Sequence, residues 1–97
     1  MNPEDIPGGI IWVFQNVLTG RFAAGLFTTR KAAEQWIEKN GCSGVLTLDP
    51  VDRGVHEWAI DQGLFTPKKP HERAAEFIAG FTTASQPHHH YENGRKA

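Results

Sequence analysis

The sequence predicts an α+β domain, in which a small and mostly antiparallel sheet of three to four strands packs with three helices. The order of the elements is the first observation behind this prediction, because two strands, a helix, a third strand and two further helices follow one another. Length is the second, since 97 residues hold one hydrophobic core. We expect a single domain over residues 10–94, a flexible arm at 1–9 and a frayed tail at 95–97.

The first two strands are expected to form a hairpin. Residues 10–14 are an unbroken run of β-branched and aromatic side chains, which is typical of a strand covered on both faces and therefore interior to the sheet. In residues 22–27, apolar side chains occupy both faces of a second strand. Thr19 and Gly20 between the two segments suit a turn.

The most clearly marked helix follows these strands. Thr28 or Thr29 can accept a hydrogen bond from an amide of the first turn, and Gly41 can adopt the left-handed conformation that ends a helix. Arg30 and Glu34 are spaced as an i, i+4 pair and are expected on the solvated side. The apolar stripe of this helix consists of Ala33, Trp36 and Ile37.

A third strand, Val45–Leu48, leads to the second helix. Asp49 is predicted to be the N-cap of this helix, with Pro50 at its first position and Asp52 at its third, where carboxylates favour the positive end of the helix dipole. Gly54 inside this helix predicts close packing against a neighbour.

Two further elements are expected towards the C-terminus. The spacing of apolar side chains predicts a third helix from about His71 to Gly80. His88–Glu92 is either a final edge strand or an extended tail. Both readings fit its mixture of polar and aromatic residues.

Charge and composition exclude several classes of function. Ten basic and eleven acidic residues leave a net charge of −1, which argues against a general nucleic-acid binder and against a membrane-surface protein. The longest apolar run is far shorter than the ~20 residues of a spanning helix. A single cysteine, Cys42, and the acidic residues of Met1–Gly9, where a signal peptide would be basic, predict a cytoplasmic location. The chain is expected to be a monomer or a homodimer.

A metal site is one candidate for chemistry. In an extended conformation His88, His90 and Glu92 point the same way, and their side chains suit zinc or another divalent transition metal. His56 and His71 can complete such a site only if the fold brings them near. The alternative is a polar segment whose histidines bond to the domain or meet a partner, with no cofactor at all.

Charged residues elsewhere in the chain are candidates for contact with a partner. The acidic group formed by Asp49, Asp52, Glu57 and Asp61 is explained in part by helix capping, and the solvated face with His56, Glu57 and Asp61 is the place to look for function. Lys68 and Lys69 are held exposed between prolines. No residue is set as a catalytic nucleophile, because Cys42 follows a helix end and the serines lack a Gly-x-Ser-x-Gly setting. The candidate partner-binding residues are Asp49, Asp52, His56, Glu57, Asp61, Lys68 and Lys69.

Short motifs along the chain carry a resemblance to a known family. These motifs are Ile11-Trp12-Val13-Phe14, Arg21-Phe22-Ala23, Trp36-Ile37, Ser43-Gly44-Val45-Leu46-Thr47, Pro50-Val51-Asp52, Trp58-Ala59-Ile60, Phe65-x-Pro67-Lys68-Lys69, Phe77-Ile78, Phe81-Thr82, Ala84-Ser85-Gln86 and His90-Tyr91-Glu92. Over about residues 10–94 the chain resembles a family of small, stand-alone, uncharacterised bacterial proteins classed as a domain of unknown function. It departs from the family pattern at His56, where the family has an aromatic residue, and at Leu48, where the family pattern is more polar.

The resemblance implies no known reaction, but it implies that the histidines near the C-terminus belong to the domain. We expect a small cytoplasmic protein-binding module. Its most concrete form is an immunity or inhibitor protein that neutralises a bacterial toxin by occlusion, an analogy of size and class. The alternative is a small zinc-type metal enzyme or sensor built on the C-terminal histidines. A dimeric structural or regulatory domain is the third reading.

Overall fold

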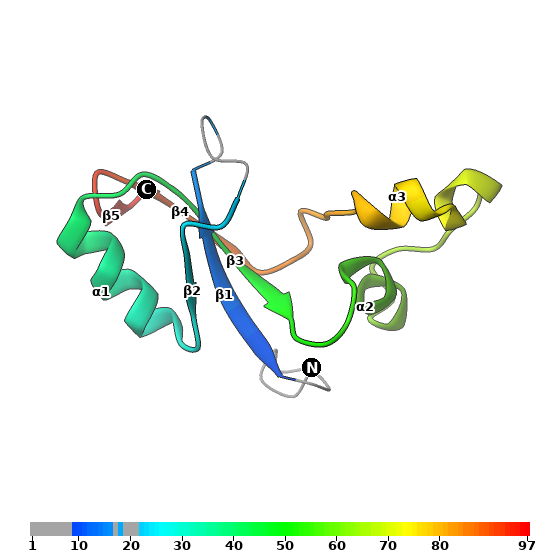
Figure 1. Ribbon diagram of the computed structural model, residues 1–97, viewed down its shortest axis with the longest axis horizontal. Helices are drawn as coiled ribbons and strands as arrows, with labels where there is room; N and C mark the ends of the chain where they lie inside the picture. The colour runs from blue at the N-terminus through cyan, green and yellow to red at the C-terminus, as the bar shows by residue number, and fades with distance from the viewer. Residues whose placement is uncertain (1–8, 17, 19–21) are drawn as a thin grey trace.

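The structure is a computed structural model that describes residues 9–16, 18 and 22–97 (Figure 1). Residues 1–8 of the expected arm, and the turn expected at Thr19 and Gly20, lie outside the described residues. The described elements are β1 (Ile10–Gln15), β2 (Gly25–Phe27), α1 (Arg30–Asn40), β3 (Gly44–Pro50), α2 (Val55–Asp61), the 3-10 helix η2 (Pro70–Arg73), α3 (Ala75–Ala79), β4 (His88–Glu92) and β5 (Arg95–Lys96). None of the helices in these ranges has the length and apolarity needed to cross a membrane.

The fold is α+β, as predicted, with a five-stranded antiparallel sheet in the order β2-β1-β3-β4-β5. β1 lies between β2 and β3, as predicted, but Phe14 is its only buried residue, so the strand is not covered on both faces. The predicted three to four strands are too few. β5 lies in the segment expected to be a frayed tail, because Asn93 and Gly94 both have positive φ and turn the chain back into a tight hairpin.

Helix α1 has the ends that the sequence predicts. The Thr29 hydroxyl accepts a hydrogen bond from the amide of Ala32 at 3.1 Å, and Gly41 closes the helix in the left-handed region with φ of 62°. Ala33 and Ile37 are fully buried against the sheet. They form the main core together with Phe14, Leu46 and Tyr91.

The start predicted for the second helix is wrong. Asp49 and Pro50 are the last residues of β3, where they pair with Ile11 and Ile10 of β1. The additional strand pairing extends β3 to Pro50, and α2 begins only at Val55. Gly54 precedes the helix, and a Cβ added there would meet no atom within 4 Å. Gly54 is therefore not explained by close packing.

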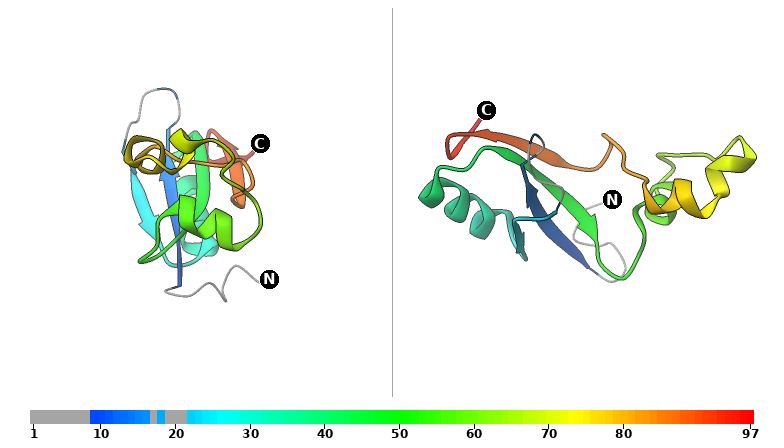
Figure 2. Two further views of the ribbon diagram at one scale, coloured as in Figure 1. Left: turned by 90° about the vertical axis from the view of Figure 1, so that its right-hand side faces the viewer. Right: turned by 45° about the horizontal axis from the view of Figure 1, so that its top comes forward.

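The third predicted helix is divided into two short pieces. Ala74 has an extended backbone, with φ of −77° and ψ of 150°, and it separates η2 from α3. These pieces and α2 lie beyond the end of the sheet (Figures 1 and 2). They surround a second small core, which contains Trp58 and Ala59 with Ile10, Val55, Phe65 and Phe81 packed against it.

The molecule is elongated, because its two cores are centred in different parts. Its extents are 44 × 30 × 20 Å and its radius of gyration is 14.3 Å. A compact chain of this length is expected to have a radius of gyration of about 12.5 Å. We call the part formed by the sheet and α1 the sheet lobe, and the part formed by α2, η2 and α3 the helical lobe.

Candidate functional site

The face of the sheet opposite α1 is the most prominent candidate site. Phe14, Leu46 and Tyr91 point towards α1, so residues one position away in each strand point to the other side. Figure 2 shows α1 along one side of the sheet. We call the other side the open face, and by the strand register it carries Ile11, Val13, Gln15, Leu26, Val45, Thr47, Asp49, His88 and His90.

Apolar side chains on this face remain accessible. Val13 and Val45 are half-buried, and Leu26, which is paired with Val13 across the strands, is 60 % exposed. Near the same hairpin, Phe22 is 83 % exposed and Leu18 is also exposed. Accessible apolar side chains that gather on one surface are typical of a site of protein contact.

A hollow of about 620 Å³ deepens the open face where the two lobes meet. One wall is formed by open-face residues such as Val13 and Thr47, and the other by residues of the helical lobe and of the segment that leads into β4. Its lining residues are Val13, Gln15, Thr47, Asp49, Pro50, Arg53, Gly54, Val55, Thr82, Thr83, Ala84, Gln86 and His88. The hollow is large enough to receive a side chain or a short loop of a partner.

Asp49 lies in the wall of this hollow and not at a helix start. The side chain of Gln86, which is only 4 % exposed, donates both to the Asp49 carboxylate at 2.6 Å and to the Leu48 carbonyl at 3.0 Å. Burial raises the pKa of Asp49, and the hydrogen bond from Gln86 partly opposes this rise. The hollow therefore holds a carboxyl group that a basic or hydrogen-bond-donating partner would stabilise.

His88 and His90 lie side by side on the open face. Their ring centroids are 5.2 Å apart, and Nδ1 of His88 lies 2.7 Å from the Gln86 carbonyl oxygen. Because a carbonyl only accepts, Nδ1 carries a proton, and in the neutral ring Nε2 keeps its lone pair. In residues 9–16, 18 and 22–97 no group of three or more His, Cys, Asp or Glu side chains is arranged to hold a metal. Glu92, His56 and His71 are therefore not gathered with the two imidazoles into such a group.

The residues of the predicted acidic group have different surroundings. Arg53 forms ion pairs with Asp61 and, at 3.8 Å, with Glu57, while Asp49 lies in the hollow. Asp52 is exposed and has a φ of 61°, in the turn after β3. Reasoning from sequence missed Arg53, although its i, i+4 spacing to Glu57 was a usable signal.

The prediction that His56 lies on the solvated face is wrong. His56 is only 7 % exposed, and its Nε2 lies 2.9 Å from the carbonyl oxygen of Glu72. Its ring packs against those of Phe65, Phe77 and Phe81. His56 therefore ties α2 to η2, in surroundings that suit an aromatic side chain.

Lys68 and Lys69 are exposed, as predicted from the flanking prolines. Their backbone amides donate to the Glu72 carboxylate at 2.9 and 2.8 Å. These hydrogen bonds lower the pKa of Glu72. The turn is thus held by two backbone amides bonded to the Glu72 side chain, and both lysines remain exposed.

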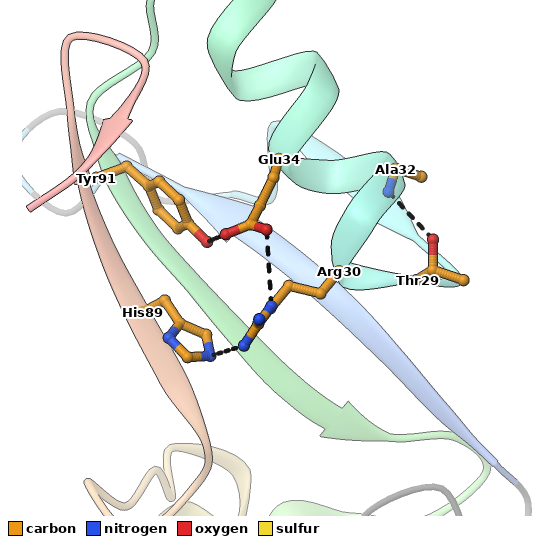
Figure 3. Close-up of polar contacts among 6 residues, drawn as sticks. All are labelled: Thr29, Arg30, Ala32, Glu34, His89 and Tyr91. Carbon is orange, nitrogen blue, oxygen red and sulfur yellow. Dashed lines mark hydrogen bonds and ion pairs between the residues drawn. The ribbon is translucent and has the colours of Figure 1, made fainter.

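A polar network joins α1 to β4 on the covered side of the sheet (Figure 3). The Tyr91 hydroxyl donates to Glu34 at 2.6 Å, so Glu34, which was predicted on the solvated side, is half-buried and faces β4. Arg30 lies 3.7 Å from Glu34 and donates to Nε2 of His89 at 3.0 Å. The pKa of Tyr91 is raised by burial and by the Glu34 carboxylate, and burial lowers the pKa of His89. This network holds the helix on the sheet that forms the site.

Comparison with known proteins identifies the family of the chain. A family model described as a domain of unknown function, DUF7710, matches residues 11–97. The chain belongs to this family. No curated protein and no solved structure matches it.

The DUF7710 match confirms the resemblance to a family of unknown function. It includes every residue of the open face, from Ile11 to His90, and every residue of the helical lobe. The open face and the hollow therefore lie within the DUF7710 domain.

Proposed function

We propose that the chain acts by contact, as a protein-binding module whose binding surface is the open face of the sheet. The accessible apolar side chains of this face are the observation that supports the proposal, with Leu26 the most exposed of them. A hydrophobic centre with polar groups near its rim is the usual anatomy of a protein interface. Its most concrete form is an immunity or inhibitor protein that occludes a bacterial toxin in the cytoplasm.

The hollow indicates what the partner would present. Val13 and Val55 supply apolar walls, and Asp49 supplies a carboxyl group that is half-buried before the partner arrives. A partner that inserts an apolar side chain next to a basic or hydrogen-bond-donating group would match both features. Arg53 also lines the hollow, and its ion pairs with Glu57 and Asp61 partly neutralise its charge.

The test uses the proteins encoded by the genes next to that of the chain. Each is co-produced with the wild-type chain in a bacterial host, and complex formation and growth are measured. We expect one neighbour to be toxic alone, to form a stoichiometric complex with the chain and to be harmless in that complex. Leu26→Asp should abolish both effects, because it places a charge on the most exposed apolar side chain of the open face.

Ile78→Asp is the matched control, because Ile78 is also an accessible apolar side chain, 42 % exposed, but lies in the helical lobe. It should leave binding and growth rescue intact. Equal behaviour of the two variants would place the interface elsewhere. The absence of any binding neighbour would remove the immunity form of the proposal.

Metal binding is the second candidate function. One observation favours it, namely the 5.2 Å separation of the His88 and His90 rings on the open face, with Nδ1 of His88 occupied by the Gln86 carbonyl. Imidazole pairs of this kind suit zinc and other late transition metals. In this form the chain would be a metal sensor or a small metal-dependent enzyme. Metal analysis of protein purified without a nickel column tests it.

A further inference from the structure

His88 and His90 have the properties of half of a zinc site. Both side chains are exposed on the same side of β4, where His89 separates the two residues in the sequence. The hydrogen bond from Nδ1 of His88 to the Gln86 carbonyl fixes the ring and its tautomer. Histidines that bind metals usually donate their other ring nitrogen to a carbonyl or carboxylate in this way. Nε2 of His88 is thus prepared to accept a metal ion.

The chain brings two such ligands together, whereas zinc in proteins takes four. Across residues 9–16, 18 and 22–97, the structure gathers no third His, Cys, Asp or Glu with this pair in a metal-binding group. A two-fold axis through the metal would supply the missing ligands, because it brings the same two histidines from a second chain. The resulting set of four imidazoles is a ligand set that zinc accepts.

The surroundings of the pair permit this approach. β5 pairs with Tyr91 and Glu92, and the amide of Ala97 donates to the His90 carbonyl. Within the described part of the chain, β5 therefore ends before it reaches His88, and no strand pairs with His88 on the side of β4 that faces away from β3. Val45, opposite His90 in the register, is half-buried and offers apolar surface beside the metal. The net charge of −1 per chain gives little repulsion between two copies.

We propose that His88 and His90 bind zinc together with the same residues of a second copy, so that the metal joins two chains through their open faces. This inference rests on the second candidate function and adds that the site is incomplete in one chain. It also implies that the zinc-linked dimer hides part of the surface proposed for protein contact.

The experiment titrates zinc chloride into the full-length, untagged chain that has been stripped with a chelator. Calorimetry measures the stoichiometry, and sedimentation velocity measures the mass. We expect one zinc ion per two chains, a monomer in the chelator and a dimer after zinc is added. His88→Ala and His90→Ala should each lower the apparent zinc affinity by about 100-fold or more, beyond the loss caused by removing a second-shell partner.

Glu92→Gln and His71→Ala are the controls, because both residues are exposed but are not gathered with the imidazole pair. Both should bind zinc and dimerise like the wild type. Loss of binding in Glu92→Gln would favour a site within one chain and overturn the inference.

Other outcomes separate this inference from the function on which it rests. One zinc ion per chain in a protein that stays monomeric would overturn the shared site but would support metal binding, the second candidate function. A dimer that persists in the chelator would show that zinc does not join the chains. Absence of zinc binding at micromolar concentration would overturn both the inference and the second candidate function.

Discussion

Single residues on the covered side of the sheet decide how α1 is held against β4. Tyr91, Glu34, Arg30 and His89 form a continuous chain of polar contacts between the two elements. Their groups are partly shielded from water, and shielding makes a hydrogen bond to a charged group stronger than one at the surface. Two predictions concern this network.

Replacing Tyr91 with Phe should destabilise the protein by about 1.5 kcal/mol, the lower end of the range for a hydrogen bond to a charged group. The lower end applies because the Glu34 side chain is 35 % exposed and regains water when the hydroxyl is lost. The ring itself keeps its edge contact with Phe14, whose centroid is 6.4 Å away. Urea denaturation measures the free energy of unfolding. A Tyr91→Phe protein as stable as the wild type would show that the hydroxyl contributes nothing.

The stability of the protein should fall as the pH is lowered through the histidine range. Burial lowers the pKa of His89 in the fold, so below pH ~6.5 the unfolded chain binds more protons than the folded one. The contribution of His89 is therefore fully present above pH ~6.5 and is lost as the pH falls towards the lower pKa of the folded state. Protonation of Nε2 would also break the hydrogen bond from Arg30.

Unfolding free energies at pH 7.5 and pH 5 provide the measurement. His89→Gln keeps a hydrogen-bond acceptor for Arg30 but cannot titrate, so its loss of stability over this interval should be smaller than that of the wild type. Subtraction of the two removes the effect of the other histidines. Equal losses in the two proteins would contradict the assignment to His89.

At the scale of elements, β3 is the strand on which the sheet lobe depends. It pairs with β1 along all six residues from Ile10 to Gln15 and with β4 on its other side. Its first residue, Gly44, lies so close to β1 that a Cβ there would overlap the carbonyl oxygen of Gln15 and press on the Phe14 ring. Glycine is needed at this position because the two strands approach so closely.

Gly44→Ala should therefore destabilise the protein by about 1–3 kcal/mol, the usual cost of overpacking. Gly54→Ala is the control, since the space around Gly54 is open, and it should change stability by less than about 0.5 kcal/mol. Both values come from thermal or urea unfolding. A harmless Gly44→Ala substitution would mean that β3 can move away from β1 without loss.

At the scale of the whole molecule, the two lobes have separate cores. The main core lies between α1 and the sheet, and the smaller one holds Trp58, Ala59 and their neighbours beyond the sheet's end. Because the helical lobe has the smaller core, we expect it to unfold locally at a lower free energy than the sheet does. The hollow lies between these two parts, so its shape depends on the helical lobe.

Phe81→Ala should loosen the helical lobe first. The Phe81 ring contacts His56 and Phe65, so its removal takes away part of the smaller core. Amide hydrogen exchange should accelerate in α2 and α3 by about 10-fold or more, corresponding to a local loss of at least ~1.4 kcal/mol, while α1 and β3 keep their protection. Uniform acceleration over the whole chain would show instead that the two lobes unfold together.

Several features of this protein were readable from the sequence because they depend on nearby residues. The ends of α1 follow from the hydroxyl of Thr29 and the freedom of Gly41, which act within a few residues of the helix. The interior position of β1 follows from its own apolar run. The Asn93-Gly94 turn is also a local signal, and it precedes β5 in the segment where a frayed tail was predicted.

The tertiary structure decided the rest, because it depends on residues far apart in the chain. Asp49 and Pro50 fit a helix start locally, but pairing with Ile11 and Ile10 keeps them in β3. Gln86 donates a hydrogen bond to Asp49 from 37 positions away in the chain, and no local sequence pattern predicts this contact.

The candidate site residues also differ in how deeply the fold buries them. His56 and Glu57 are neighbours in the sequence, yet one is packed among phenylalanines and the other is exposed. The α+β class, the family and helix α1 could be predicted from the sequence, since capping hydrogen bonds and apolar periodicity depend on residues close together in the chain. Which polar side chains meet at the open face follows from the three-dimensional fold, since strand register and the burial of side chains are set by contacts between distant segments.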